Sequence, residues 1–98
     1  MNITKHMNGK ELVVAPEGRL DTKTASELEE ALIGSIDEAE SLVLDFAKLD
    51  YISSAGLRVL LTVNTLMSAK GGMKVINVND LVQEVFKLTS FTALLTIE

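Results

Sequence analysis

Short apolar runs alternate with segments of helical periodicity along almost the whole chain, and this alternation limits the folds that it can adopt. Apolar residues recur at helical spacing over about 22–36 and 54–69, and a third helix is expected to begin at Asp80. The apolar runs that read as strands lie within residues 2–7, 10–16, 41–46 and 73–78. Strands that alternate with helices imply right-handed crossovers and a mainly parallel sheet.

Asn8-Gly9 separates the first two apolar runs. Asn-Gly between two extended segments favours a tight hairpin turn, because both turn positions require a positive φ angle. The sequence therefore predicts an α/β fold with a mixed, mostly parallel sheet of four to five strands, an N-terminal β-hairpin and three main helices. We expect the second and third helices to pack on the sheet, and the tail over 91–97 fits either a short strand or a helical turn.

Caps and core positions follow from the same patterns. Asp21 or Thr22 is expected to cap the first helix, and Gly71-Gly72 to end the second. Asp80 and Gln83 have the spacing of a cap and its return partner at the third helix. The residues expected to be buried are Leu44, Leu57, Leu60, Leu61, Val75 and Phe86.

Length and composition exclude several classes of function. Ninety-eight residues fit one domain over 1–98. A net charge of −5 without a basic cluster argues against nucleic acid as a partner. The chain has no cysteine, and its single histidine, His6, leaves little for a metal site or a catalytic triad. No apolar run approaches the roughly 20 residues of a membrane span, and the N-terminus lacks the apolar stretch of a signal peptide, so we expect a cytoplasmic domain without membrane insertion.

Two junctions between a strand and a helix carry residues suited to a site. One spans 18–22 and the other spans 50–57, and in open α/β sheets ligand sites gather where strands end and helices begin. Ser53 or Ser54 is expected at the start of the second helix, where free N–H groups and the helix dipole favour a phosphate on a serine. On residue propensity alone, simple capping of the helix is the stronger explanation of a serine at this position.

Residues 42–61, LVLDFAKLDYISSAGLRVLL, resemble the signature of the STAS domain, which occurs in bacterial anti-sigma factor antagonists and in the tails of sulfate transporters. In the antagonists an Asp-Ser pair is followed by a small residue and Gly-Leu, and the serine is phosphorylated. Ser53 takes the place of that aspartate, Ser54 that of the phosphoacceptor, and Gly56-Leu57 matches the final pair. Gly18-Arg19-Leu20-Asp21 resembles a Gly-x-Leu-Asp segment whose acidic residue lies near the phosphorylation loop in the family.

The resemblance implies a STAS-like fold and a mechanism of partner switching. The chain would bind an anti-sigma factor that is also a serine kinase, release the sigma factor, and be switched off by phosphorylation of Ser54, with Ser53 as the second candidate. A PP2C-type phosphatase would reset it. The chain would have no catalytic residue and no cofactor, because ATP and magnesium belong to the kinase. The sequence shows no strongly apolar surface stripe, so we expect a monomer when free. The residues expected around the phosphoacceptor are Asp21, Thr22, Ser53, Gly56, Leu57 and Arg58.

The main alternative is a phosphorylation-independent STAS subunit of a sensor assembly or a membrane transporter complex, in which Ser54 only caps a helix. An enzyme is not expected, because the chain lacks the Gly-x-Ser-x-Gly elbow of serine hydrolases and the Gly-x-x-x-x-Gly-Lys loop of nucleotide-binding proteins. Asp45 ends a buried strand, as the acceptor of a receiver domain does, but the acidic cluster that binds magnesium in receivers is missing.

Overall fold

A computed structural model describes all residues, 1–98, and contains six strands and three α-helices. The strands are β1 (Asn2–Asn8), β2 (Glu11–Leu20), β3 (Ser41–Asp45), β4 (Leu49–Ile52), β5 (Met73–Ile76) and β6 (Thr96–Ile97). The helices are α1 (Thr22–Ile33), α2 (Ser54–Met67) and α3 (Asp80–Leu88), and short 3-10 turns cover Ile36–Glu38 and Phe91–Ala93.

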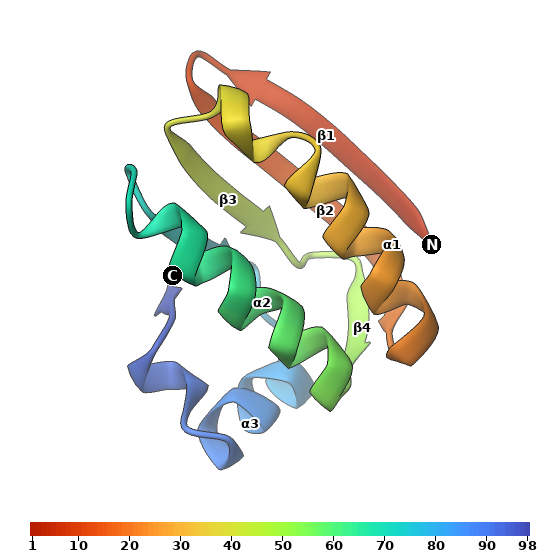
Figure 1. The fold of residues 1–98 in the computed structure, drawn as a ribbon. Helices are drawn as coiled ribbons and strands as arrows, with labels where there is room; N and C mark the ends of the chain where they lie inside the picture. Colours follow the sequence, from red (N-terminus) through yellow and green to blue (C-terminus); the bar gives the residue numbers. More distant parts are fainter.

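The strands form one mixed sheet in the order β1-β2-β3-β5-β6, and β4 pairs with β2 outside this path. Only β1 and β2 are antiparallel, and every other pair is parallel. The predicted hairpin is present, but its two turn residues are Gly9 and Lys10 instead of Asn8 and Gly9, and only Gly9 has a positive φ. The α/β class, the hairpin and the mostly parallel sheet are confirmed (Figure 1). The sheet has six strands instead of four to five, because 49–52 forms a short strand where a loop was expected and the tail supplies another.

Strand β2 is long enough to pair in parallel with two different strands along its length. Its first half pairs with β3 up to Val14, and its last three residues, from Gly18, pair with β4. The register shifts between Gly18 and Arg19, and Gly18 has a φ of +95°, a conformation that favours glycine. Pro16 lies in the gap between the two partners, where β2 has no parallel neighbour.

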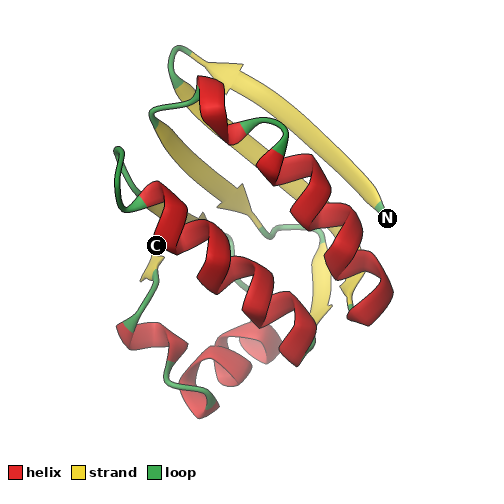
Figure 2. Ribbon diagram, in the orientation of Figure 1, coloured by secondary structure: helices red, strands yellow, loops and turns green.

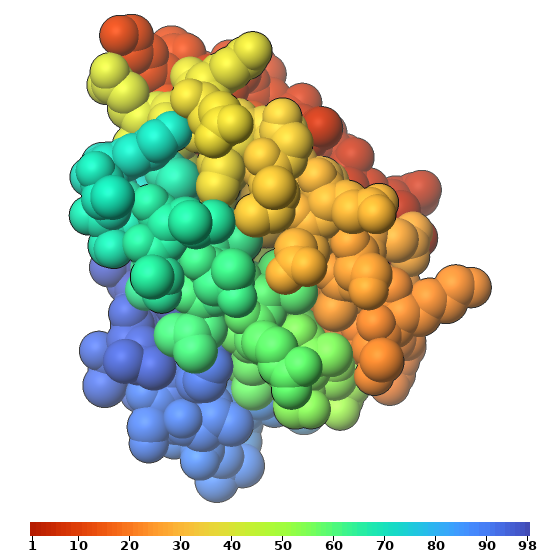
Figure 3. Space-filling model, viewed as in Figure 1, coloured from red at the N-terminus to blue at the C-terminus, as the bar shows by residue number.

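Helices α1 and α2 lie side by side across one face of the sheet (Figures 1 and 2). Both helices also form much of the surface seen in Figure 3, with α3 at its lower end. Helix α3 packs against β4. The expectation that the second and third helices cover the sheet therefore omitted α1, whose buried side chains include Leu28 and Leu32.

The core lies between this face of the sheet and the helices. The facing rows Leu12–Leu42–Met73 and Val14–Leu44–Val75 are set by the parallel register and are buried. Of the residues expected to be buried, Leu44, Leu57, Leu60, Val75 and Phe86 are buried. Leu61 was predicted wrongly: it lies on the outer face of α2 with 41% of its surface exposed.

The helix ends also correct several expectations. Asn79 caps α3 by accepting from the Val82 N–H at 2.8 Å, so Asp80 is the first helical residue and not the cap. Helix α1 ends at Ile33 instead of residue 36, and α2 ends at Met67 instead of residue 69. No helix has the length and the apolar composition needed to cross a membrane.

Adjacent leucines of α2 give a direct test of the core. Leu60→Asp places an unpaired charge in the core, and we expect it to lower the free energy of unfolding by about 3–5 kcal/mol or to prevent folding. Leu61→Asp changes the same residue type at an exposed position and should cost less than about 1 kcal/mol. Urea denaturation followed by circular dichroism measures both, and equal losses would contradict the assigned core.

Candidate functional site

The two junctions singled out in the sequence lie next to each other in space. Residues Arg19 and Leu20 at the end of β2 pair with Tyr51 and Ile52 at the end of β4. The pairing continues past the strand, because the Ser53 N–H donates to the Leu20 carbonyl at 2.8 Å. The residues that follow each strand open α1 and α2, so both helices begin at the same edge of the sheet.

Asp21 is the N-cap of α1. Its carboxylate accepts from the N–H groups of Lys23 at 3.1 Å and Thr24 at 3.0 Å, and its own N–H donates to the Thr24 hydroxyl at 2.8 Å. Hydrogen bonds to the carboxylate from the N–H and the hydroxyl of Thr24, together with the Lys23 N–H and the charge of Arg19, outweigh desolvation and lower the pKa of Asp21 from its ordinary 3.8. Asp21 is therefore an ionised structural cap beside the serines. The sequence identified Asp21 but missed its return partner Thr24. The signal that could have revealed Thr24 is its place as the third residue of the helix, the position from which a side chain returns a hydrogen bond to the cap.

Ser53 and Ser54 have different roles at the start of α2. Ser53 is the N-cap and is half-buried, and its hydroxyl accepts from the Gly56 N–H at 3.4 Å. Ser54 is the first residue of the helix, is exposed, and its hydroxyl makes no hydrogen bond within the chain. Ser53 is therefore the residue that caps α2, and serine and aspartate are equally suited to this role. Ser54 is left as the accessible hydroxyl.

Gly56 and Leu57 belong to the packing beneath this surface. A Cβ atom at Gly56 would stand 2.8 Å from Ile52 Cγ1 and from Leu20 Cγ, so no larger residue fits without displacing these two buried side chains. Leu57 is buried in the core. Both residues hold α2 close to the two strands, and neither is available for contact with another molecule.

Cations lie around the two helix starts. The Arg19 guanidinium lies 4.5 Å from the centre of the Tyr51 ring, a cation–π pair that the sequence did not reveal. Lys23 in the first turn of α1 and Arg58 in the second turn of α2 are exposed and form no ion pair. Thr22, the first residue of α1, is exposed as well. The surface therefore presents two hydroxyls, of Thr22 and Ser54, among several positive charges.

The arrangement lacks the parts of a hydrolytic or metal centre. The only histidine, His6, is exposed on β1 and not at this edge. No three His, Asp or Glu side chains gather where they could hold a metal ion. Asp45 is the last residue of β3 and stabilises the turn after it, because its carboxylate accepts from the Ala47 N–H at 3.0 Å and from the Asn77 amide at 2.9 Å. The chemistry available at this edge is that of an exposed hydroxyl beside free N–H groups.

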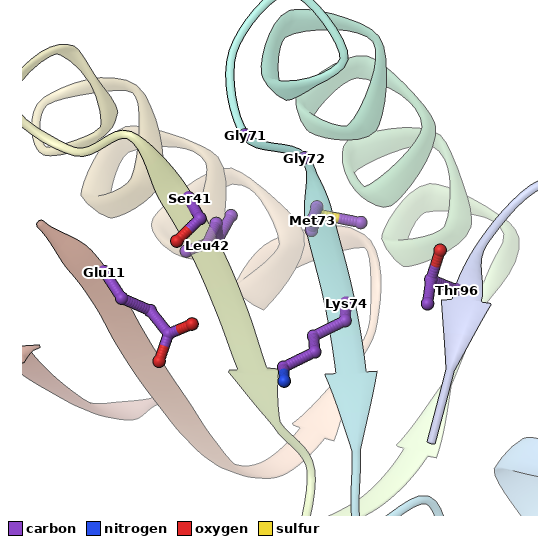
Figure 4. Close-up of a pocket in the computed structure, with 8 residues that line it drawn as sticks. All are labelled: Glu11, Ser41, Leu42, Gly71, Gly72, Met73, Lys74 and Thr96. Carbon is purple, nitrogen blue, oxygen red and sulfur yellow. The ribbon is translucent and has the colours of Figure 1, made fainter.

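A separate hollow of about 350 Å³ lies at the other ends of the parallel strands (Figure 4). Glu11 and Lys74 extend over it, and Gly71 and Gly72 form part of its rim. The Lys74 ammonium lies 3.6 Å from a carboxylate oxygen of Glu98. None of the site residues predicted from the sequence lines this hollow.

Comparison with known proteins places the chain in a family. A family model of the STAS domain matches residues 2–98. A Bordetella bronchiseptica protein named as an anti-sigma factor antagonist, BtrV, is 36% identical over 85 residues, which cover 85% of this chain and 73% of BtrV.

Solved structures agree with the observed architecture. An anti-sigma factor antagonist from Mycobacterium paratuberculosis has a TM-score of 0.90 at 22% identity, covering 98% of this chain and 83% of that one. The antagonist SpoIIAA of Bacillus matches in its unphosphorylated form (TM-score 0.77, 16% identity, 99% of this chain and 87% of that one). Its phosphorylated form matches similarly (TM-score 0.76, 16% identity, 99% and 91%). The fold is thus the one found in solved anti-sigma factor antagonists. The chain belongs to the STAS-domain family.

The cap at Asp21 makes a pH-dependent prediction. Because folding lowers the pKa of Asp21, the stability contributed by its charge is full above pH 3.8 and is lost as the pH falls through the lower pKa of the folded state. Asp21→Asn keeps an oxygen acceptor without the charge, so the wild type should have the higher urea midpoint near neutral pH and lose this advantage in acid. Asp21→Ala should have a lower midpoint than both near neutral pH. A difference between wild type and Asp21→Asn that does not change with pH would contradict the assigned cap.

Proposed function

We propose that the chain is an anti-sigma factor antagonist that works by partner switching. In the unmodified state it binds an anti-sigma factor with serine kinase activity and so frees the sigma factor. Phosphorylation of Ser54 ends this binding, and a PP2C-type phosphatase restores it. The chain acts in the cytoplasm as a monomeric substrate and binding module, and it catalyses no reaction of its own.

The observation that carries the proposal is the exposed Ser54 hydroxyl, free of hydrogen bonds, at the first position of α2. Its neighbour Ser53 uses its hydroxyl as the helix cap, which favours Ser54 as the acceptor. The name of BtrV supports the antagonist role, and the two forms of SpoIIAA support the view that this fold carries a phosphate without rearranging.

The outer face of α2 extends the surface on which the kinase would bind. Arg58, Leu61 and Thr62 follow Ser54 at helical spacing and are exposed. An exposed leucine between an arginine and a threonine suits a protein interface, which needs apolar contact surrounded by polar groups. Leu61, which the sequence wrongly predicted to be buried, therefore lies on the surface proposed for the partner.

A phosphate on Ser54 would act on the complex more than on the fold. It adds a charge of about −1.5 to −2, which the N-terminus of α2 accommodates favourably. An acidic group of the partner about 5 Å away would be repelled by roughly 3 kcal/mol per unit charge at an effective dielectric constant near 20. Such a penalty lowers affinity by roughly 10²- to 10³-fold, which is enough to reverse a competition between two partners.

The adjacent serines provide a matched pair of variants. We expect a cognate anti-sigma factor kinase, given ATP, to phosphorylate wild type and Ser53→Ala but not Ser54→Ala, because the Ser54 hydroxyl is exposed and free whereas that of Ser53 caps the helix. Ser53→Ala should lose about 1 kcal/mol of stability with its cap. Mass spectrometry locates the phosphate, and calorimetry gives the affinity for the kinase before and after modification.

Two outcomes would change the proposal. Modification of Ser53 in the wild type would move the acceptor by one residue. If neither serine is modified and Ser54→Asp binds the partner as tightly as wild type, the switch is absent. The chain would then be a phosphorylation-independent subunit of a sensor assembly or a transporter complex.

A further inference from the structure

Arg58 is an exposed arginine whose charge has no partner within the chain. Its guanidinium takes part in none of the ion pairs or side-chain hydrogen bonds. Arg19, by contrast, is held over the Tyr51 ring at 4.5 Å. Arg58 is therefore available to bind a group that the unmodified chain lacks.

The helix places Arg58 beside Ser54. The two residues are four apart in α2, and side chains at this spacing are neighbours on one face, with about 5–6 Å between their Cβ atoms. Side chains of a helix lean toward its N-terminus, so a long side chain covers the turn that precedes its own Cα. An acidic group four residues before a basic one is also the more favourable orientation of such a pair.

No carboxylate of the chain forms an ion pair with this guanidinium. The first turn of α2 contains no acidic residue, and its cap is the neutral Ser53. The carboxylate of Asp21 at the neighbouring helix start already accepts hydrogen bonds from the N–H groups of Lys23 and Thr24. A phosphate on Ser54 would be the only anion in the turn that Arg58 covers.

We propose that Arg58 binds the phosphate of phosphorylated Ser54 and holds it on the outer face of α2. This inference rests on the proposed function, since it concerns the modified state of the same site. The fork of N–H donors on a guanidinium matches two phosphate oxygens, so the pair forms parallel hydrogen bonds as well as an ion pair. The local charge changes from about +1 to about −1, and the arginine is withdrawn from the partner in the same step.

The second ionisation of the phosphate measures this contact. Phosphoserine is placed at position 54 by genetic code expansion, so that no kinase is needed, and its pKa is read from a phosphorus NMR titration. The second pKa of phosphoserine is ordinarily about 6. Arg58→Gln should raise this pKa by roughly 0.3 pH units, the size expected from the loss of one ion pair at this helical spacing. Lys23→Gln removes an equal charge from the adjacent helix start and should raise the pKa much less.

An unchanged pKa in Arg58→Gln would overturn the inference, and so would equal shifts in Arg58→Gln and Lys23→Gln, which would indicate only a diffuse field. The titration does not depend on recognition by a kinase. A kinase that ignores Ser54 would therefore defeat the proposed function while leaving this measurement intact, and a missing pKa shift would leave the phosphorylation result unaffected.

Discussion

The parallel pairing of the last residues of β2 with β4 is the constraint on which the proposed partner-binding surface depends. Leu20 pairs with Ile52, and the Ser53 N–H extends the ladder to the Leu20 carbonyl at 2.8 Å. Each strand leads directly into a helix, so this one register places Asp21 and Ser53 side by side as caps of neighbouring helices. If the register slipped by one residue, Leu20 or Ile52 would leave the core, and burial of both therefore keeps the two helix starts together.

Small residues appear at the two junctions for separate physical reasons. Gly18 adopts a φ of +95° where β2 passes from one partner to the other, a geometry that other residues strain to reach. Gly56 is required by space, because α2 approaches the side chains of Leu20 and Ile52 too closely for a Cβ. Both requirements concern the fold. Ser54, by contrast, is exposed and has no such role in the packing.

Much of the fold could be predicted from the sequence because strong local signals agree with the tertiary structure. Asn8-Gly9 marked the hairpin, and the helical periodicity located α1 and α2 to within a few residues. Strand β4 could not be found, since it has four residues and its half-buried face follows no clear alternation. Leu61 was misplaced because periodicity does not show how wide a stripe of α2 the sheet and the other helices cover.

The candidate site could also be predicted only in part from the sequence. Asp21, Ser53 and Ser54 were visible in the sequence as residues at strand–helix junctions, and the structure brings the junctions together. Which serine caps α2 and which is exposed depends on where the helix begins, and a shift of one residue there exchanges their roles. The Arg19–Tyr51 contact joins residues of two strands, one of which the sequence did not reveal, so only the tertiary pairing could show it.

The most direct test of the account is an NMR titration of the ¹⁵N-labelled chain with its proposed partner, a cognate anti-sigma factor kinase. We expect the largest changes in amide signals over residues 19–24 and 53–62, because the two helix starts and the outer face of α2 form one surface. The strands around the hollow at Glu11 and Lys74 should change little. Changes confined to those strands, or to only one of the two helix starts, would contradict the claim that paired strand ends build a single partner-binding surface.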